Sequence, residues 1–245
     1  MRCHEIDYKI IGSGAQLLEV TLNSGETAIG EAGAMSYMES DISMETKLGD
    51  GSTPNDNIFK KLFTASKRVA MGESLFMTHF TNRGQERRSV AFSAPFPGTI
   101  AAINLGNTTG SVICQREAFL SAALGTKLSI EFTKRMGAGF FGKEGFVLQR
   151  LEGDGMAFLH AGGTLVEKHL ENEKIRIDSG SLVGFTSGMD YSVDLIKSVK
   201  SMLFSGEGAF LTTISGTGTV WIQSLPFPRL VDRIHQSLPV KKKTD

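Results

Sequence analysis

The stretch GEGAFLTTISGTGTVWI, residues 206–222, decides between two classes of fold. Its closely spaced glycines, Gly216 and Gly218 above all, resemble a phosphate-binding loop, but such a loop needs a helix directly after it, whose N-terminal amides face the anion. Residues 219–222 (TVWI) are instead β-branched or aromatic, which favours a strand. The same objection applies to GSGAQL at 12–17, which leads into alternating apolar and polar residues. The sequence therefore predicts a hairpin with a glycine turn and excludes a Rossmann unit.

The stretch has two counterparts earlier in the chain. Residues 71–92, 142–160 and 205–223 align without a gap on a glutamate, an apolar residue and two turn-forming positions. The aligned residues are Glu73, Glu144 and Glu207; Phe80, Leu151 and Ile214; Asn82, Gly153 and Gly216; and Gly84, Gly155 and Gly218. A weaker upstream half of each unit aligns Gly33, Gly125 and Gly188. These matches predict three internal repeats, at about 18–96, 97–162 and 163–225.

The repeats predict the architecture. An isolated hairpin is at best marginally stable in water, so the three units are expected to share one core around a pseudo-threefold axis. We therefore expect an all-β fold of β-sandwich or double-stranded β-helix type, forming a single domain over 1–245. Two short helices are expected, at 55–70 and at 229–238, where apolar residues recur with helical spacing.

Composition excludes several classes of protein. The 26 Lys and Arg balance the 26 Asp and Glu, so no net positive charge favours DNA. Two cysteines are too few for a disulfide framework, and the N-terminus lacks an apolar run of signal-peptide length. The expected location is the cytoplasm, with association at a membrane surface left open.

The chain resembles a known family in several motifs. They are LNSGETAIGEAGAMSYM, GESLFMTHFTN, SAPFPGTIAAINL, IRIDSGSLVGF and SLPFPRLVDRI, which together span nearly the whole sequence. They are similar to the altered-inheritance-of-mitochondria proteins, a mitochondrial biogenesis family formerly classed as a domain of unknown function. The resemblance implies a fold like that of the trp RNA-binding attenuation protein and a link to membrane organisation. It implies no catalytic motif.

Catalytic and metal-binding patterns are not evident in the sequence. The five histidines form no HxH pair, so we expect no metal and no cofactor. Cys114 lies in an apolar strand pattern typical of a small core residue, and no GxSxG motif occurs. The sequence therefore predicts a non-enzymatic interaction or scaffold protein, with an unidentified protein partner and homo-oligomerisation. An enzyme with a pocket between the repeats is the third reading.

Two sets of charged residues are candidate binding sites. Basic residues precede each predicted hairpin and would cluster at one end of a threefold domain, where they could bind RNA or phospholipid; otherwise they are solvated loop residues. They are Lys60, Lys61, Lys67, Arg68, Lys134, Arg135, Lys197 and Lys200. The second set is an acidic ring of Glu73, Glu144 and Glu207 that would bind a cation, against the alternative of strand-edge charges facing water.

Overall fold

The structure is a computed structural model, and it describes residues 2–48, 76–131, 147–195 and 210–238 of the 245-residue chain. The predicted helix at 55–70 lies outside these ranges. Within them, strands dominate and one α-helix occurs near the C-terminus. The elements are β1 Asp7–Ile11, β2 Leu17–Leu22, β3 Thr27–Gly30, β4 Met35–Met38, β5 Ile42–Leu48, β6 Phe76–Asn82, β7 Arg88–Ser93, β8 Gly98–Asn104, β9 Ser111–Gln115, β10 Phe119–Ala123, β11 Lys127–Ile130, β12 Leu148–Glu152, β13 Met156–Gly162, β14 Leu165–Asp178, β15 Leu182–Thr186, β16 Asp190–Leu195, β17 Phe210–Gln223 and α3 Phe227–Ser237.

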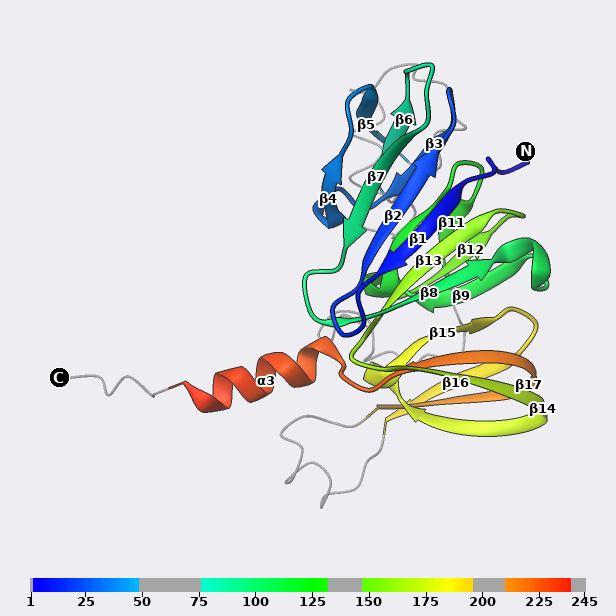
Figure 1. Cartoon of the computed structure of the whole chain (residues 1–245). Coiled ribbons are helices and arrows are strands. Elements are labelled where there is room, and N and C mark those ends of the chain that lie inside the picture. The colour runs from blue at the N-terminus through cyan, green and yellow to red at the C-terminus, as the bar shows by residue number, and fades with distance from the viewer. Residues whose placement is uncertain (1, 49–75, 132–146, 196–209, 239–245) are drawn as a thin grey trace, which may run out of the picture.

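The strands form three curled antiparallel sheets, which confirms the all-β class (Figure 1). A four-stranded sheet has the order β1-β2-β7-β4, and a six-stranded sheet has the order β5-β6-β3-β10-β13-β8. The third sheet runs β11-β12-β9-β15-β17-β14, with β16 paired to β17. We call the three predicted repeats the first, second and third segments. Their strands lie at the top, middle and bottom of Figure 1, respectively.

One pairing scheme describes all three segments. In the first segment β2 and β4 pair β7, while β3 and β5 pair β6. In the second, β8 and β10 pair β13, while β9 and β11 pair β12. In the third, β14 and β15 pair the second half of β17, while β14 and β16 pair its first half. Pairing of β3 with β10 and of β9 with β15 joins neighbouring segments. The internal repeat and the single domain themselves stay predictions.

The predicted hairpins are wrong in their pairing, although strands flank the turn in the first two segments. β6 and β7 lie in different sheets, and so do β12 and β13, so in each case the chain crosses between sheets instead of folding back on itself. In the third segment no turn forms. β17 runs unbroken through Gly216 and Gly218, whose φ angles are 124° and 157°. These two glycines lie opposite the place in β14 where the pairing register shifts, between Leu170 and Glu173. Glycine at such an irregularity allows backbone angles that other residues rarely adopt.

The upstream glycine alignment also needs correction. Gly125 and Gly188 both have positive φ, in the turns after β10 and β15. Gly33 lies in a short 3₁₀ turn before β4, and the residue that occupies the corresponding turn after β4 is Asp41, with φ 70°. Aspartate tolerates this left-handed conformation because its short polar side chain can bond locally. A search for matched glycines therefore missed the equivalent position.

The core lies between the sheets in three clusters, one centred on each segment. Alternation in β2 buries Leu18, Val20 and Leu22 and turns the intervening residues outward. β10 and β15 are buried along their whole length because layers cover both faces. Phe80 and Phe92 meet edge to face at 5.1 Å and link two sheets of the first segment.

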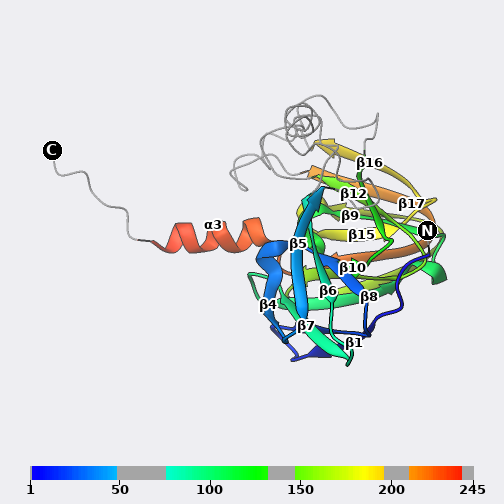
Figure 2. The same cartoon turned by 90° about the horizontal axis from the view of Figure 1, so that it is seen from above.

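The predicted C-terminal helix at 229–238 is confirmed as α3. Pro226 precedes it and Pro228 lies in its first turn, where a proline costs no intrahelical hydrogen bond. The helix leaves the body between the first and third segments and extends away from it (Figures 1 and 2). None of its residues is buried.

Candidate functional site

All the charged residues predicted as binding sites lie outside the described ranges. This holds for the eight basic candidates and for Glu73, Glu144 and Glu207. The structure does show two other surfaces: a polar pocket beside the N-terminal segment, and the exposed apolar face of α3.

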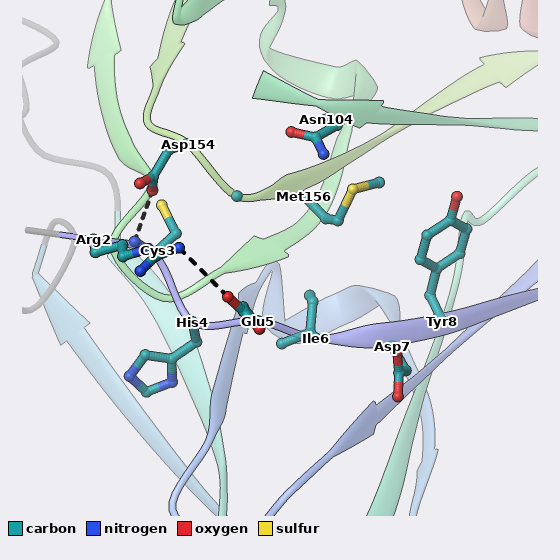
Figure 3. Close-up of a pocket in the computed structure, with 11 residues that line it drawn as sticks. Arg2, Cys3, His4, Glu5, Ile6, Asp7, Tyr8, Asn104, Asp154 and Met156 are labelled. Carbon is teal, nitrogen blue, oxygen red and sulfur yellow. Dashed lines mark hydrogen bonds and ion pairs between the residues drawn. The ribbon is translucent and has the colours of Figure 1, made fainter. Parts of the chain in front are cut away.

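The pocket has a volume of about 730 Å³ and lies between the N-terminal segment and the loop that links β12 to β13 (Figure 3). Its lining residues are Arg2, Cys3, His4, Glu5, Ile6, Asp7, Tyr8, Asn104, Asp154, Gly155 and Met156. Three carboxylates and one guanidinium make it polar and locally acidic.

Hydrogen bonds fix the N-terminal wall of the pocket. The Cys3 amide donates to Asp154 Oδ1 at 2.8 Å, and the His4 amide donates to the Leu124 carbonyl at 2.9 Å. The Thr27 amide donates to His4 Nδ1 at 2.9 Å. The bond from Cys3 holds the pKa of the Asp154 carboxyl below its ordinary value, because it stabilises the charged form. The segment is thus tied to the body before β1 begins.

The chemistry of the described residues gives the pocket no evident reaction. No three His, Cys, Asp or Glu side chains in the described ranges could hold a metal ion.

The two cysteines are both buried, as was predicted for Cys114. Burial raises the pKa of the Cys114 thiol to about 12, and burial lowers the pKa of His160 to about 4. Cys114 therefore stays a thiol and His160 stays neutral near pH 7.

The surface of α3 carries an exposed apolar stripe. Phe227, Val231, Ile234 and Leu238 follow one another at spacings that place them on one face of the helix, and all four are exposed. The fraction of exposed surface reaches 53% for Ile234 and 59% for Leu238. Polar and charged residues occupy the opposite face, which makes α3 strongly amphipathic.

Two contacts anchor the first turn of α3 to the body. The Phe227 ring stacks on Phe96 with centroids 4.9 Å apart, and Arg229 pairs with Asp178 at 3.1 Å. Phe96 in turn packs edge to face on the buried His160 ring at 4.7 Å. These contacts fix the direction of the helix, while Val231, Ile234 and Leu238 lie beyond the anchor.

β4 and β5, in the upper part of Figure 1, also carry exposed apolar side chains. Tyr37 and Met38 of β4 and Met44 of β5 are all exposed, Met44 to 50%. β4 is an edge strand paired to β7, with Glu39 directly after it. The Tyr37 side chain lies on the same face of its sheet as Glu19, to which its hydroxyl donates, whereas Met38 points to the opposite face and Met44 belongs to another sheet, so the three do not form one surface.

Sequence reasoning found α3 but not the exposure of its apolar face. The helical spacing of Val231 and Ile234 predicted an apolar face, but the pattern does not tell whether that face packs on the body or stays exposed. The pocket was missed as well, because its lining comes from the N-terminal segment and from the distant loop that contains Asp154. Among the described helices none has the length and apolar character needed to cross a bilayer.

Comparison with known proteins places the chain in a family. It is 26% identical over 224 residues to an uncharacterized protein of Streptococcus pyogenes serotype M6, covering 91% of this chain and 87% of that one. A crystal structure of another Streptococcus pyogenes protein covers 96% of this chain and all of its own, with a TM-score of 0.75 and 23% identity. That likeness shows a shared fold. Residues 8–225 match the family described as mitochondrial biogenesis AIM24, so the chain belongs to that family, whose function is uncharacterised, as the resemblance predicted.

Proposed function

We propose that this protein is a non-enzymatic interaction or scaffold protein and that α3 is the element through which it engages a partner. The observation that carries the proposal is the apolar stripe of α3, which projects from the body with no buried residue. α3 follows directly after residues 8–225, the part of the chain that matches the family.

Energetics support a docking role for α3. Apolar surface removed from water contributes about 25 cal/mol per Å², so covering the stripe would contribute to the free energy of binding a partner. Helices shorter than about 12–15 residues are marginal in water on their own, and α3 has 11 residues. A partner that covers the stripe would therefore stabilise the helix as well as bind it.

The body is suited to a scaffold. We propose that its three segments are copies of one unit, and the recurrence of one pairing scheme in all of them supports this. Joining strands β3 to β10 and β9 to β15 makes a continuous hydrogen-bonded frame. Such a frame would hold the first turn of α3 in a fixed direction.

Affinity capture from cells that express the natural chain tests this function. The intact protein is compared with Ile234→Glu, which puts a charge in the stripe, and with Gln236→Glu, which adds the same charge on the opposite face. We expect the Ile234→Glu variant to lose partners that Gln236→Glu retains. If all three proteins capture the same set, or if a turnover assay finds an activity abolished by one side chain in a folded protein, the proposal is wrong.

A further inference from the structure

We propose that residues 3–6 form a strap across the joint between the first and second segments, and that protonation of His4 releases it. The joint is the pairing of β3 with β10. The strap bonds to Thr27, which begins β3, to Leu124, which directly follows β10, and to Asp154 in the loop between β12 and β13. The inference goes beyond the proposed function, because it does not involve α3.

His4 is the residue of the strap that holds both strands of the joint. Its main-chain amide donates to the Leu124 carbonyl at 2.9 Å, and its ring Nδ1 accepts the Thr27 amide proton at 2.9 Å. The Leu124 amide in turn donates to the Thr27 carbonyl at 3.1 Å. Thr27 is 4% exposed, so water has little access to its amide.

The bond from Thr27 to the ring requires a neutral His4. A ring nitrogen that accepts a hydrogen bond carries no proton, so the proton of the neutral ring is on Nε2. The imidazolium has an N–H at both nitrogens, and the Thr27 amide would then face a second donor. A buried donor without an acceptor costs free energy, and histidine is the side chain that changes charge between about pH 5 and pH 8. Mild acid therefore removes this bond.

The other charged groups around the strap keep their charge in mild acid. They lie on the strap and its ends, before β3, after β10, in the β6–β7 loop and in the β12–β13 loop: Arg2, Glu5, Asp7, Glu26, Arg87, Lys127 and Asp154. Carboxyl groups ordinarily titrate below about pH 5, and arginine and lysine far above neutral pH. The bond from the Cys3 amide holds the pKa of the Asp154 carboxyl below its ordinary value. Among the described residues at this joint, His4 is thus the group that senses the change.

Glycines form the seat of the strap. A side-chain carbon added at Gly125, Gly153 or Gly155 would lie only 2.8, 2.9 or 2.6 Å from an atom of Cys3. Cys3 is buried in this seat, and Ile6 is buried at the other end of the strap. The seat thus accommodates Cys3 because its walls carry no side chains.

The third segment shows that this space can be filled without a strap. At Gly218, which aligns with the glycine at 155, an added carbon would lie 2.8 Å from Met189 Sδ. Met189 follows the turn glycine of the third segment, as the shorter Thr126 follows that of the second. Cys3 fills the remaining space, with its Sγ 3.8 Å from Thr126 Oγ1. The third segment fills the space with a residue of its own turn, whereas the second fills it with an element that can leave while the strands stay paired.

Release of the strap would also dismantle the pocket. Residues 2–8 supply one wall of it, and Asn104, Asp154, Gly155 and Met156 supply the other. Figure 3 shows the Cys3 side chain beside Asp154 and the His4 ring on the opposite side of the strap. The protonation state of His4 would therefore decide whether the pocket is formed.

The reactivity of Cys3 in the full-length protein tests the proposal. The chain has two cysteines, both buried. Cys3 becomes accessible when the strap leaves, whereas Cys114 requires the sheets to open. Each thiol is labelled with a dipyridyl disulfide, which still reacts in mild acid, and the label is located by mass spectrometry. Each rate is divided by that of the urea-unfolded chain at the same pH, which removes the pH dependence of the thiol itself.

We expect this rate ratio for Cys3 to rise by about tenfold or more from pH 7.5 to pH 5. The ratio for Cys114 should stay at least about tenfold below that of Cys3 at pH 5. Equal ratios for the two thiols would show that the strap leaves only when the whole body unfolds, and would overturn the proposal.

Two variants identify His4 as the sensor. His4→Asn keeps a side-chain acceptor that does not titrate, so Cys3 should react slowly at both pH values. His4→Phe keeps a ring but removes the acceptor, so Cys3 should react fast at both. A pH response in either variant as large as that of the natural chain would assign the effect to another group and overturn the proposal.

The glycine seat gives a test at constant pH. Gly155→Ala places a carbon against Cys3 and should raise the rate ratio for Cys3 at pH 7.5, whereas Gly33→Ala has open space and should not. Equal ratios in these two variants would show that the seat does not hold the strap. Ile234→Glu, the variant that tests α3, should leave the ratio for Cys3 unchanged, so the strap and the proposed function are tested separately.

Discussion

His160 shows how one buried residue links stability to pH. It is 4% exposed, and burial lowers its pKa in the folded state from 6.5 to about 4. Since the unfolded chain binds the proton more tightly, folding stability is at its full value above about pH 6.5 and falls as the pH drops toward 4. The loss should be roughly 1–3 kcal/mol, because one pKa unit corresponds to about 1.4 kcal/mol and residual solvent access reduces the full effect.

Urea unfolding at a series of pH values checks this prediction. His160→Leu replaces the titratable ring by an apolar side chain of similar size. The variant's free energy of unfolding should therefore change less with pH between 4 and 6.5. The exposed His169 is the comparison site, and His169→Gln should keep the slope of the natural chain. An equally steep slope in His160→Leu would show that other groups cause the acid sensitivity.

Gly98 tests how closely β8 and β13 approach. A side-chain carbon added at Gly98 would overlap the Ala161 carbonyl oxygen and the His160 ring, neither of which can move freely. We expect Gly98→Ala to destabilise the fold by about 2–4 kcal/mol. Gly14→Ala has open space around it and should change stability by less than about 0.5 kcal/mol. Equal unfolding midpoints for the two variants would contradict the packing described for this strand pair.

The ion pair between Glu131 and Arg150 joins the end of β11 to β12. Arg150 Nε and Nη2 donate to the two carboxylate oxygens at 2.9 and 3.0 Å, and both side chains are largely shielded from water. Glu131→Gln removes this charge-assisted pair and should cost about 1–3 kcal/mol. Glu152→Gln alters an exposed carboxylate on the same strand pair and should cost less than about 0.5 kcal/mol. If both variants unfold at the same urea concentration, the pair contributes no net stability.

At the scale of the elements, α3 should be dispensable for the fold of an isolated molecule. A chain ending after Arg229 keeps the stacking on Phe96 and the pairing with Asp178, and apart from the half-buried Leu230 the described side chains that it loses are exposed. Its free energy of unfolding, measured where the natural chain is monomeric, should fall by less than about 1 kcal/mol. A larger loss would mean that the helix packs on its own body.

The elements also show where sequence reasoning succeeded and where it failed. Periodicity predicted strands on both sides of each glycine turn, and the two prolines near 227 predicted the start of the C-terminal helix. Pairing was predicted wrongly, because a glycine turn has the same local signature whether the next strand folds back or crosses to another sheet. Asp41 was missed for a related reason: a left-handed residue need not be glycine.

At the scale of the molecule, local patterns predicted the all-β class but could not predict the surfaces. Exposure of Met44 and Ile234 depends on which distant strands and helices cover them, and that information is not contained in their neighbours along the chain. The charged residues that seemed most informative in the sequence lie outside the described ranges, so the binding hypotheses built on them stay hypotheses. The candidate site proposed here comes from side chains that are apolar and ordinary in sequence.

Amide hydrogen exchange tests the central claim most directly, because it reports on α3 in the intact molecule. We predict that exchange in α3 slows when partners captured by the natural chain are added to it, and that it does not slow in Ile234→Glu. Exchange in α3 that is the same with and without captured partners would contradict the account.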